Sequence, residues 1–190
     1  MKRINFSLVA RAALAGVVVY VAPASGQQGG GEAAPIYEIK LPSGFRDWKL
    51  ISVARVGGIV NDLRVKLGND VAIETYREGK LPFPDGTIIA RLAYRAVTSE
   101  ENNKAFRAAG ERQGVPPEQT TKLLAESLVA GPATNVQFMV KDSKKYASTG
   151  GWGFAQFTDG KPDDKAVHET CFSCHVPAKD RDFVFTRYAP

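Results

Sequence analysis

The chain has 190 residues, of which 25 are Lys or Arg and 20 are Asp or Glu. This length suits one domain with a sizeable core, and a hydrophobic content of 44% is ordinary for a globular protein. These values exclude a wholly disordered chain, a collagen-like fibre and a multi-pass membrane protein. Two cysteines are too few for a disulfide scaffold. Lys and Arg do not cluster in a stripe, so we expect no nucleic-acid partner.

The N-terminus has the pattern of a removable export signal. Lys2 and Arg3 precede an apolar stretch at residues 12–22, and Ala22-Pro23-Ala24 has the form of a cleavage site. The stretch is shorter than the roughly 20 residues that span a bilayer, although a single N-terminal anchor stays open. We therefore expect a signal peptide at 1–24, a flexible leader at 25–44, a folded domain at 45–190, and a periplasmic location.

Apolar alternation, capping residues and turn residues predict the elements of the domain. In chain order these are strands at 50–56 and 63–67, a helix at 69–79, a turn at 82–86, a strand at 87–97, helices at 99–112 and 117–129, a strand pair at 135–141 and 152–158, and a final strand at 182–188. Gly131-Pro132 is expected to end the second of the two adjacent helices. The pattern predicts an α+β fold that is predominantly antiparallel sheet with flanking helices.

One short motif carries chemistry. Cys171 and Cys174, followed by His175, form the C-x-x-C-H signature of c-type haem attachment. The two thiols would hold one haem covalently, and His175 would reach the iron from one face. Haem c is attached outside the cytoplasm, which agrees with the export signal. A redox pair stays open as an alternative, as does a zinc site that adds His168 to the motif.

A second axial ligand for the iron is not evident. His168 lies three residues before the motif, and we expect it to be a local or surface residue. Met139 is the only methionine after residue 24, but it lies in an apolar strand where a core role is the commoner one. A Met ligand would be typical of an electron-transfer cytochrome. We expect a five-coordinate iron with an open distal position.

The sequence resembles the cytochrome P-460 family, which includes the beta-sheet cytochromes called c-prime-beta. The resemblance covers about residues 45–188. It rests on an ordered series of short motifs: Arg46-Asp47-Trp48, Leu67-Gly68-Asn69, Pro82-Phe83-Pro84-Asp85-Gly86-Thr87, Val140-Lys141-Asp142, Gly150-Gly151-Trp152-Gly153-Phe154 and the closing Cys171–Cys174–His175 motif. It implies a monohaem c-type cytochrome, a homodimer, and His175 as the proximal ligand.

The resemblance also identifies candidates for the distal side of the haem. Hydroxylamine-oxidising members have a lysine cross-linked to the porphyrin and a distal carboxylate. In this chain the lysine position falls on Arg91 and the carboxylate position on Gln137. A guanidinium stays protonated, and a carboxamide is no carboxylate base. Phe83 is the aromatic expected over the iron, and its alternative is a core residue that anchors the turn.

Three functions follow as hypotheses. The first is a periplasmic haem protein of c-prime-beta type that binds a small gaseous or nitrogenous ligand such as NO or CO, with a redox partner protein. The second is a hydroxylamine-oxidising enzyme, with Lys66 or Lys80 in place of the missing lysine. The third is an electron carrier that uses Met139 as its sixth ligand.

Overall fold

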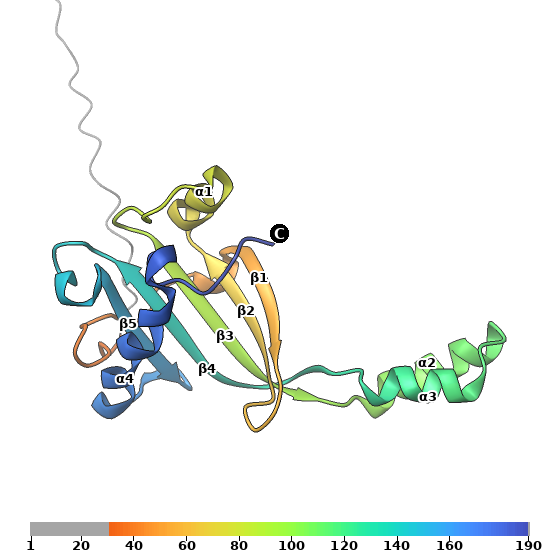
Figure 1. Ribbon diagram of the computed structural model, residues 1–190. Coiled ribbons are helices and arrows are strands. Elements are labelled where there is room, and N and C mark those ends of the chain that lie inside the picture. The colour runs from red at the N-terminus through yellow and green to blue at the C-terminus, as the bar shows by residue number, and fades with distance from the viewer. Residues whose placement is uncertain (1–30, 190) are drawn as a thin grey trace, which may run out of the picture.

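The computed structural model describes residues 31–189, so the expected signal peptide and the first part of the leader lie outside the described residues. The centre of the fold is a six-stranded antiparallel sheet whose strands follow one another in chain order (Figure 1). Its strands are β1 (Lys49–Val56), β2 (Asp62–Gly68), β3 (Ile88–Val97), β4 (Val129–Lys141), β5 (Trp152–Thr158) and β6 (Lys161–Pro162). The predicted α+β, predominantly antiparallel fold is confirmed.

Helix α1 (Asp70–Glu78) begins and ends where its capping residues predict. The side chain of Asn69 accepts a hydrogen bond from the backbone N–H of Ala72 at 3.0 Å, and Gly79 ends the helix in the left-handed conformation. Ala72 and Ile73 are buried on the inner side of the helix. The helix therefore covers the end of the sheet where β2 leads into it (Figure 1).

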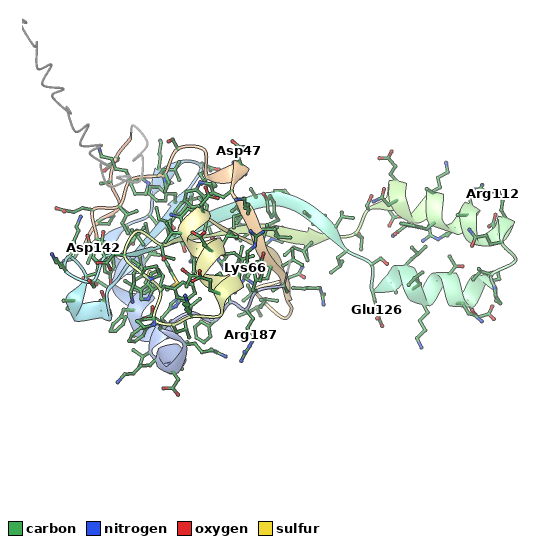
Figure 2. The ribbon with its side chains drawn as sticks, turned by 90° about the horizontal axis from the view of Figure 1, so that it is seen from above. Asp47, Lys66, Arg112, Glu126, Asp142 and Arg187 are labelled. Atoms are coloured by element: carbon green, nitrogen blue, oxygen red, sulfur yellow. The ribbon has the colours of Figure 1, made fainter. Side chains whose placement is uncertain are left out.

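Two helices form an arm that extends away from the sheet. Strands β3 and β4 continue outward into α2 (Glu100–Arg112) and α3 (Pro117–Ala125), which lie side by side (Figures 1 and 2). Helix α3 is shorter than the predicted 117–129, since Val129 already begins β4. Gly131 and Pro132, expected to end that helix, lie inside β4. The β3–β4 register is irregular in this region, which explains why a proline is tolerated there.

The last helix, α4 (Lys165–His175), packs against β5 and contains the C-x-x-C-H motif (Figure 1). After it, a 3₁₀ segment at Val176–Arg181 leads into a stretch without regular structure. The predicted strand at 182–188 is therefore wrong. Asp182 and Phe183 have φ values of 53° and 64°, which lie outside the extended region that a strand requires.

The core includes part of the segment that was expected to be a flexible leader. Ala34, Tyr37 and Ile39 are buried, and the hydroxyl of Tyr146 donates a hydrogen bond to the carbonyl of Tyr37 at 3.0 Å. The expectation of a flexible leader at 25–44 is thus corrected for its described part, because these apolar side chains pack on the sheet. No helix among residues 31–189 is long and apolar enough to cross a membrane.

Candidate functional site

Helix α4 presents both cysteines on one side. Asp164 caps its N-terminus by accepting a hydrogen bond from the backbone N–H of Val167 at 3.1 Å. Residues three apart on a helix share a face, so the thiols of Cys171 and Cys174 lie on the same side, with Cys171 partly buried and Cys174 exposed. Burial raises the pKa of the Cys171 thiol, and the neighbouring Cys174 adds to this effect.

His168 fixes the helix to the sheet. Its side chain is fully buried. Its Nε2 accepts a hydrogen bond from the backbone N–H of Gln156 in β5 at 3.0 Å, and its Nδ1 donates to the carbonyl of Asp164 at 2.7 Å. Of the two roles expected for His168, a local or a surface residue, the structure supports the local one. Because both ring nitrogens are used, His168 has no lone pair left for a metal.

A cavity of about 380 Å³ lies between α4 and the sheet. Cys171, Cys174 and His175 line it from the helix side. The sheet side is formed by residues from β2, β3, β4 and β5, chiefly Arg64, Lys66, Ile89, Arg91, Gln137, Met139 and Phe154. The motif predicted to hold the cofactor therefore faces a cavity.

His175 has a defined orientation at this cavity. Its Nδ1 lies 2.8 Å from the carbonyl oxygen of Phe183, and since a carbonyl only accepts, Nδ1 carries the hydrogen and Nε2 keeps its lone pair. The rings of Phe154 and Phe185 flank the imidazole at centroid distances of 5.0 and 5.3 Å. Burial lowers the pKa of His175, although the hydrogen bond to Phe183 opposes this shift. The neutral ring is the form that binds a metal.

The opposite wall carries a row of polar side chains. Lys66, Arg91, Gln137 and Gln156 are direct partners on four successive strands, so they share one face of the sheet. Gln137 contacts Gln156 through their side-chain amides. Arg91 and Gln137, predicted from motifs far apart in the sequence, thus lie side by side on the cavity wall. Lys66 lies next to Arg91 in the same row and also lines the cavity.

The arginines in this wall share one carboxylate. Arg64 Nε is 3.0 Å from Asp62, and Arg91 Nη1 is 3.9 Å from the same side chain. Arg91 Nη2 also donates to Asn135 at 2.6 Å, yet within the described chain its buried Nε has no hydrogen-bond partner. Burial lowers the pKa of Arg91 to about 10, so the guanidinium stays charged at neutral pH.

These features fit a haem of the c type. The thiols share one side of α4, and the Nε2 lone pair of His175 is free. Among residues 31–189, Asp62 is the one carboxylate paired with Arg64 and Arg91, so Arg64, Lys66 and Arg91 leave an excess of two positive charges in the wall. A haem carries two propionate groups, and carboxylates are the natural partners of arginine. The orphaned Nε of Arg91 is a further donor without an acceptor.

Phe83 lies elsewhere. It is 4% exposed but does not line this cavity. Its ring packs on Tyr76 and Trp152 at 5.0 and 5.8 Å, and its backbone N–H donates to Asp182 at 2.9 Å. The structure therefore places Phe83 as a core residue that anchors the turn, away from the position expected over the iron.

The remaining candidates from the sequence differ in whether they line the cavity. Lys80 is exposed and pairs with Glu78 at 3.1 Å, outside the cavity. Met139 lines the cavity, two residues from Gln137 on the same face of β4. Lys66, one of the two substitute lysines named from the sequence, lines the cavity. Arg64 was not named, although strand alternation puts it on the same face as Lys66. No group of three His, Cys, Asp or Glu side chains within residues 31–189 could hold a metal ion, which counts against the zinc alternative.

A sheet whose polar face meets a C-x-x-C-H helix defines a β-rich haem-binding protein. The family model of Cytochrome P460 matches residues 42–186, which is most of the chain. The chain therefore belongs to the cytochrome P460 family, whose members are haem c cytochromes. No curated protein matches the chain.

Proposed function

We propose that the chain is a periplasmic monohaem cytochrome of c-prime-beta type that binds a small ligand such as NO or CO. The observation that carries the proposal is that Cys171, Cys174 and His175 line one side of the cavity, opposite a sheet side whose lining residues include no Asp or Glu. When bound, the haem supplies an iron that takes up a diatomic ligand and exchanges electrons.

The helix residues attach and orient the cofactor. Cys171 and Cys174 would hold the haem through thioether bonds to its two vinyl groups. His175 would offer Nε2 to the iron, because its Nδ1–H donates a hydrogen bond to the carbonyl of Phe183. Cys174 is exposed, and Phe185 at the cavity edge is 52% exposed. One edge of the cofactor would thus be accessible to a redox partner protein.

The sheet residues define which ligands are processed. Ile89 and Met139 offer apolar surface in the cavity, where Arg91 and Gln137 also lie. The resemblance to the family assigns Arg91 to the position of the cross-linking lysine and Gln137 to that of the distal carboxylate. A positioned base contributes about 10²–10⁴-fold to proton removal, and neither residue supplies one. The proposal therefore includes ligand binding without efficient hydroxylamine oxidation.

Absorption spectra of the holoprotein, with and without NO, test this function. We expect an ordinary ferrous c-type Soret band, a high-spin five-coordinate iron and NO binding. A ferrous band far to the red, with rapid hydroxylamine turnover, would indicate a lysine cross-link, for which Lys66 is the cavity amine. Arg91→Lys is the matched variant, since it restores the family's lysine, and Gln137→Glu restores the carboxylate.

Mass spectrometry of protein exported through a haem-c maturation system tests the covalent link. We expect a chain without residues 1–24 that carries one haem. Replacing Cys171 and Cys174 by Ala abolishes the added mass. A bare polypeptide under competent maturation conditions would contradict the proposal.

An electron carrier with Met139 as sixth ligand is the second candidate. The position of Met139 in the cavity wall favours it. Such an iron would be low-spin and would bind CO poorly. Met139→Leu then separates the candidates, because it converts a low-spin spectrum to high-spin only if the thioether is a ligand.

The proposed assembly is a homodimer. Light scattering of the holoprotein tests this proposal.

A further inference from the structure

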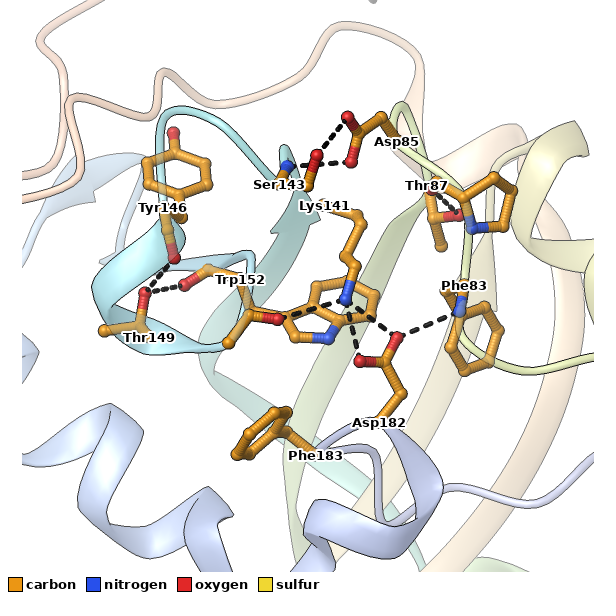
Figure 3. A network of polar contacts seen from close by, with 12 residues as sticks. Phe83, Asp85, Thr87, Lys141, Ser143, Tyr146, Thr149, Trp152, Asp182 and Phe183 are labelled. Atoms are coloured by element: carbon orange, nitrogen blue, oxygen red, sulfur yellow. Dashed lines mark hydrogen bonds and ion pairs between the residues drawn. The ribbon is translucent and has the colours of Figure 1, made fainter.

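The segment that follows the C-x-x-C-H motif has an unusual backbone. Asp182 and Phe183 are consecutive non-glycine residues with φ values of 53° and 64°. This left-handed conformation is disfavoured for side chains with a Cβ, and it persists only where surrounding contacts enforce it. The structure shows which contacts do so (Figure 3).

A buried ion pair holds the first of these residues. Lys141 Nζ lies 2.7 and 2.9 Å from the two carboxylate oxygens of Asp182, and the two side chains are only 7% and 9% exposed. Lys141 also donates to the carbonyl of Gly150 at 3.1 Å and lies 4.9 Å above the ring of Trp152. The backbone N–H of Phe83 donates to the same carboxylate at 2.9 Å. Both charges are thus satisfied on several sides.

A close contact holds the second residue. The ring of Phe183 lies so near Gly150 that a Cβ added there would come within 2.2 Å of it. Gly150 also has a φ of 67°, which favours glycine. On the other side the ring packs against Phe172 of α4 at 5.4 Å. The position of Phe183 is therefore fixed by its side chain and by the residue before it.

We propose that the Lys141–Asp182 ion pair positions the carbonyl of Phe183 so that it accepts the Nδ1 hydrogen of His175, and thereby sets the tautomer and donor strength of this ligand. This inference rests on the proposed function, in which His175 binds the iron. Lys141 and Asp182 are positioning residues, because they act on His175 through the backbone of Phe183. Their side chains are not among those that line the cavity.

The hydrogen bond from His175 to Phe183 is expected to lower the reduction potential of the haem iron. A hydrogen bond from the non-ligating nitrogen fixes the ring and raises the basicity of the ligating nitrogen. A stronger donor favours ferric over ferrous iron, so this contact lowers the reduction potential. Loss of the ion pair frees the strained backbone at Asp182 and Phe183, weakens the hydrogen bond and raises the potential.

The apoprotein gives the first test, since it needs no cofactor. Nitrogen-15 NMR of the histidine rings in the unmodified apoprotein is expected to show His175 as the Nδ1–H tautomer. In Lys141→Met that signal is expected to shift toward a mixture of both tautomers. A dominant Nε2–H tautomer in the unmodified protein would overturn the proposal without any variant.

The holoprotein gives the second test. Lys141→Met is expected to keep its covalent haem, to raise the reduction potential and to lower the iron–histidine stretching frequency in resonance Raman spectra. Asp182→Asn, which keeps the shape of the side chain, is expected to shift both quantities in the same direction, and it decides the question should Lys141→Met fail to fold. Unchanged potential and stretching frequency in a folded, haem-loaded variant would refute the positioning role and leave the proposed function intact.

Lys145→Met is the matched control. Lys145 also lies over an aromatic ring, that of Tyr146 at 5.5 Å, and pairs with Glu38 at 3.4 Å, but its side chain is 43% exposed. We expect its potential, Raman spectrum and His175 tautomer to match those of the unmodified protein. A shift equal to that of Lys141→Met would show a general effect of lysine removal and would overturn the proposal. Absence of covalent haem in the unmodified chain would instead contradict the proposed function.

Discussion

The helix side and the sheet side of the cavity differ in how far their polar groups are satisfied. On the helix side, His168 uses both ring nitrogens, and His175 has a carbonyl partner for its Nδ1. On the sheet side, Arg91 keeps a buried nitrogen that has no partner among residues 31–189, and two arginines share Asp62. Buried polar groups are normally paired. The helix side is thus organised before a cofactor arrives, whereas the sheet side has capacity left for a negatively charged group.

The ion pair behind the helix side offers the strongest test of this difference. Removing one partner of a buried pair leaves an uncompensated charge, which costs about 3–5 kcal/mol. We therefore expect Lys141→Met to lower the free energy of unfolding of the apoprotein by about that amount in urea denaturation. The exposed pair of Lys145 is expected to contribute less than about 1 kcal/mol. Equal losses for the two variants would remove the distinction between the two lysines.

The second largest effect on stability is expected at His168, which anchors α4 to the sheet. His168→Ala removes the acceptor of a backbone N–H and leaves a cavity in the core. An unsatisfied buried donor costs about 1–3 kcal/mol, and the lost packing adds to it, so we expect a total loss of about 2–4 kcal/mol. Hydrogen exchange is expected to accelerate in α4 more than in β3. Uniform acceleration throughout the sheet would argue against a local anchor.

The sheet side is expected to tolerate the loss of a positive charge, unlike the ion pair behind the helix side. Burial lowers the pKa of Lys66, and repulsion from Arg64 and Arg91 lowers it further, against the opposing effect of Asp62. The unfolded chain therefore binds more protons than the folded one in the window below the ordinary lysine pKa of 10.5, and stability rises with pH there. Arg91→Gln removes one repulsive charge.

We expect Arg91→Gln to raise the pKa of Lys66 and to change apoprotein stability by less than about 1 kcal/mol, since an incompletely paired charge is removed. Carbon-13 NMR of the methylated Lys66 amine measures the pKa of this residue. Arg46→Gln is the control, because Arg46 lies over the ring of Phe45 and does not line the cavity. An unchanged Lys66 pKa in Arg91→Gln would show that the two residues do not interact across the strands.

The smallest effect is expected on the outer face of α4. Lys165 and Glu169 are four residues apart, 3.5 Å from each other and 72% and 56% exposed. Lys165→Ala is expected to cost no more than about 0.5 kcal/mol in thermal unfolding. A loss comparable to that of His168→Ala would mean that the helix is held by its exposed face rather than by its buried one.

Local patterns predict most of the fold because they depend on neighbouring residues. Asn69 and Gly79 mark the ends of α1, and Ser99 caps α2, as the sequence indicates. The final strand is wrong because Phe183, Val184 and Phe185 have strand-like composition but no pairing strand, and contacts with Lys141 and Gly150 determine the backbone instead. Those contacts join residues about 30–40 positions apart, which periodicity does not register.

The candidate site shows the same limit. The C-x-x-C-H motif is readable because it is contiguous, and the family motifs indicated Arg91 and Gln137. Arg91 and Gln137 are direct partners because of the β3–β4 register. The sequence does not predict this register, because the arm is inserted between the two strands. The motif of Phe83 allows two roles, an aromatic over the iron or a core residue that anchors the turn, and the structure supports the second, because its ring packs on Trp152.

The arm formed by α2 and α3 leaves the sheet beyond Val97 and Val129. The cavity-lining residues of these strands lie further along them, at Ile89, Arg91, Gln137, Phe138 and Met139. Gly114 turns the chain between the two helices with a φ of 70°. Each doubling of such a connection costs only about 0.6 kcal/mol of closure entropy. The turn at Gly114 is therefore a natural place to insert a fluorescent reporter, whose emission would be read out at a distance from the ligand-binding chemistry while the strand register stays unchanged.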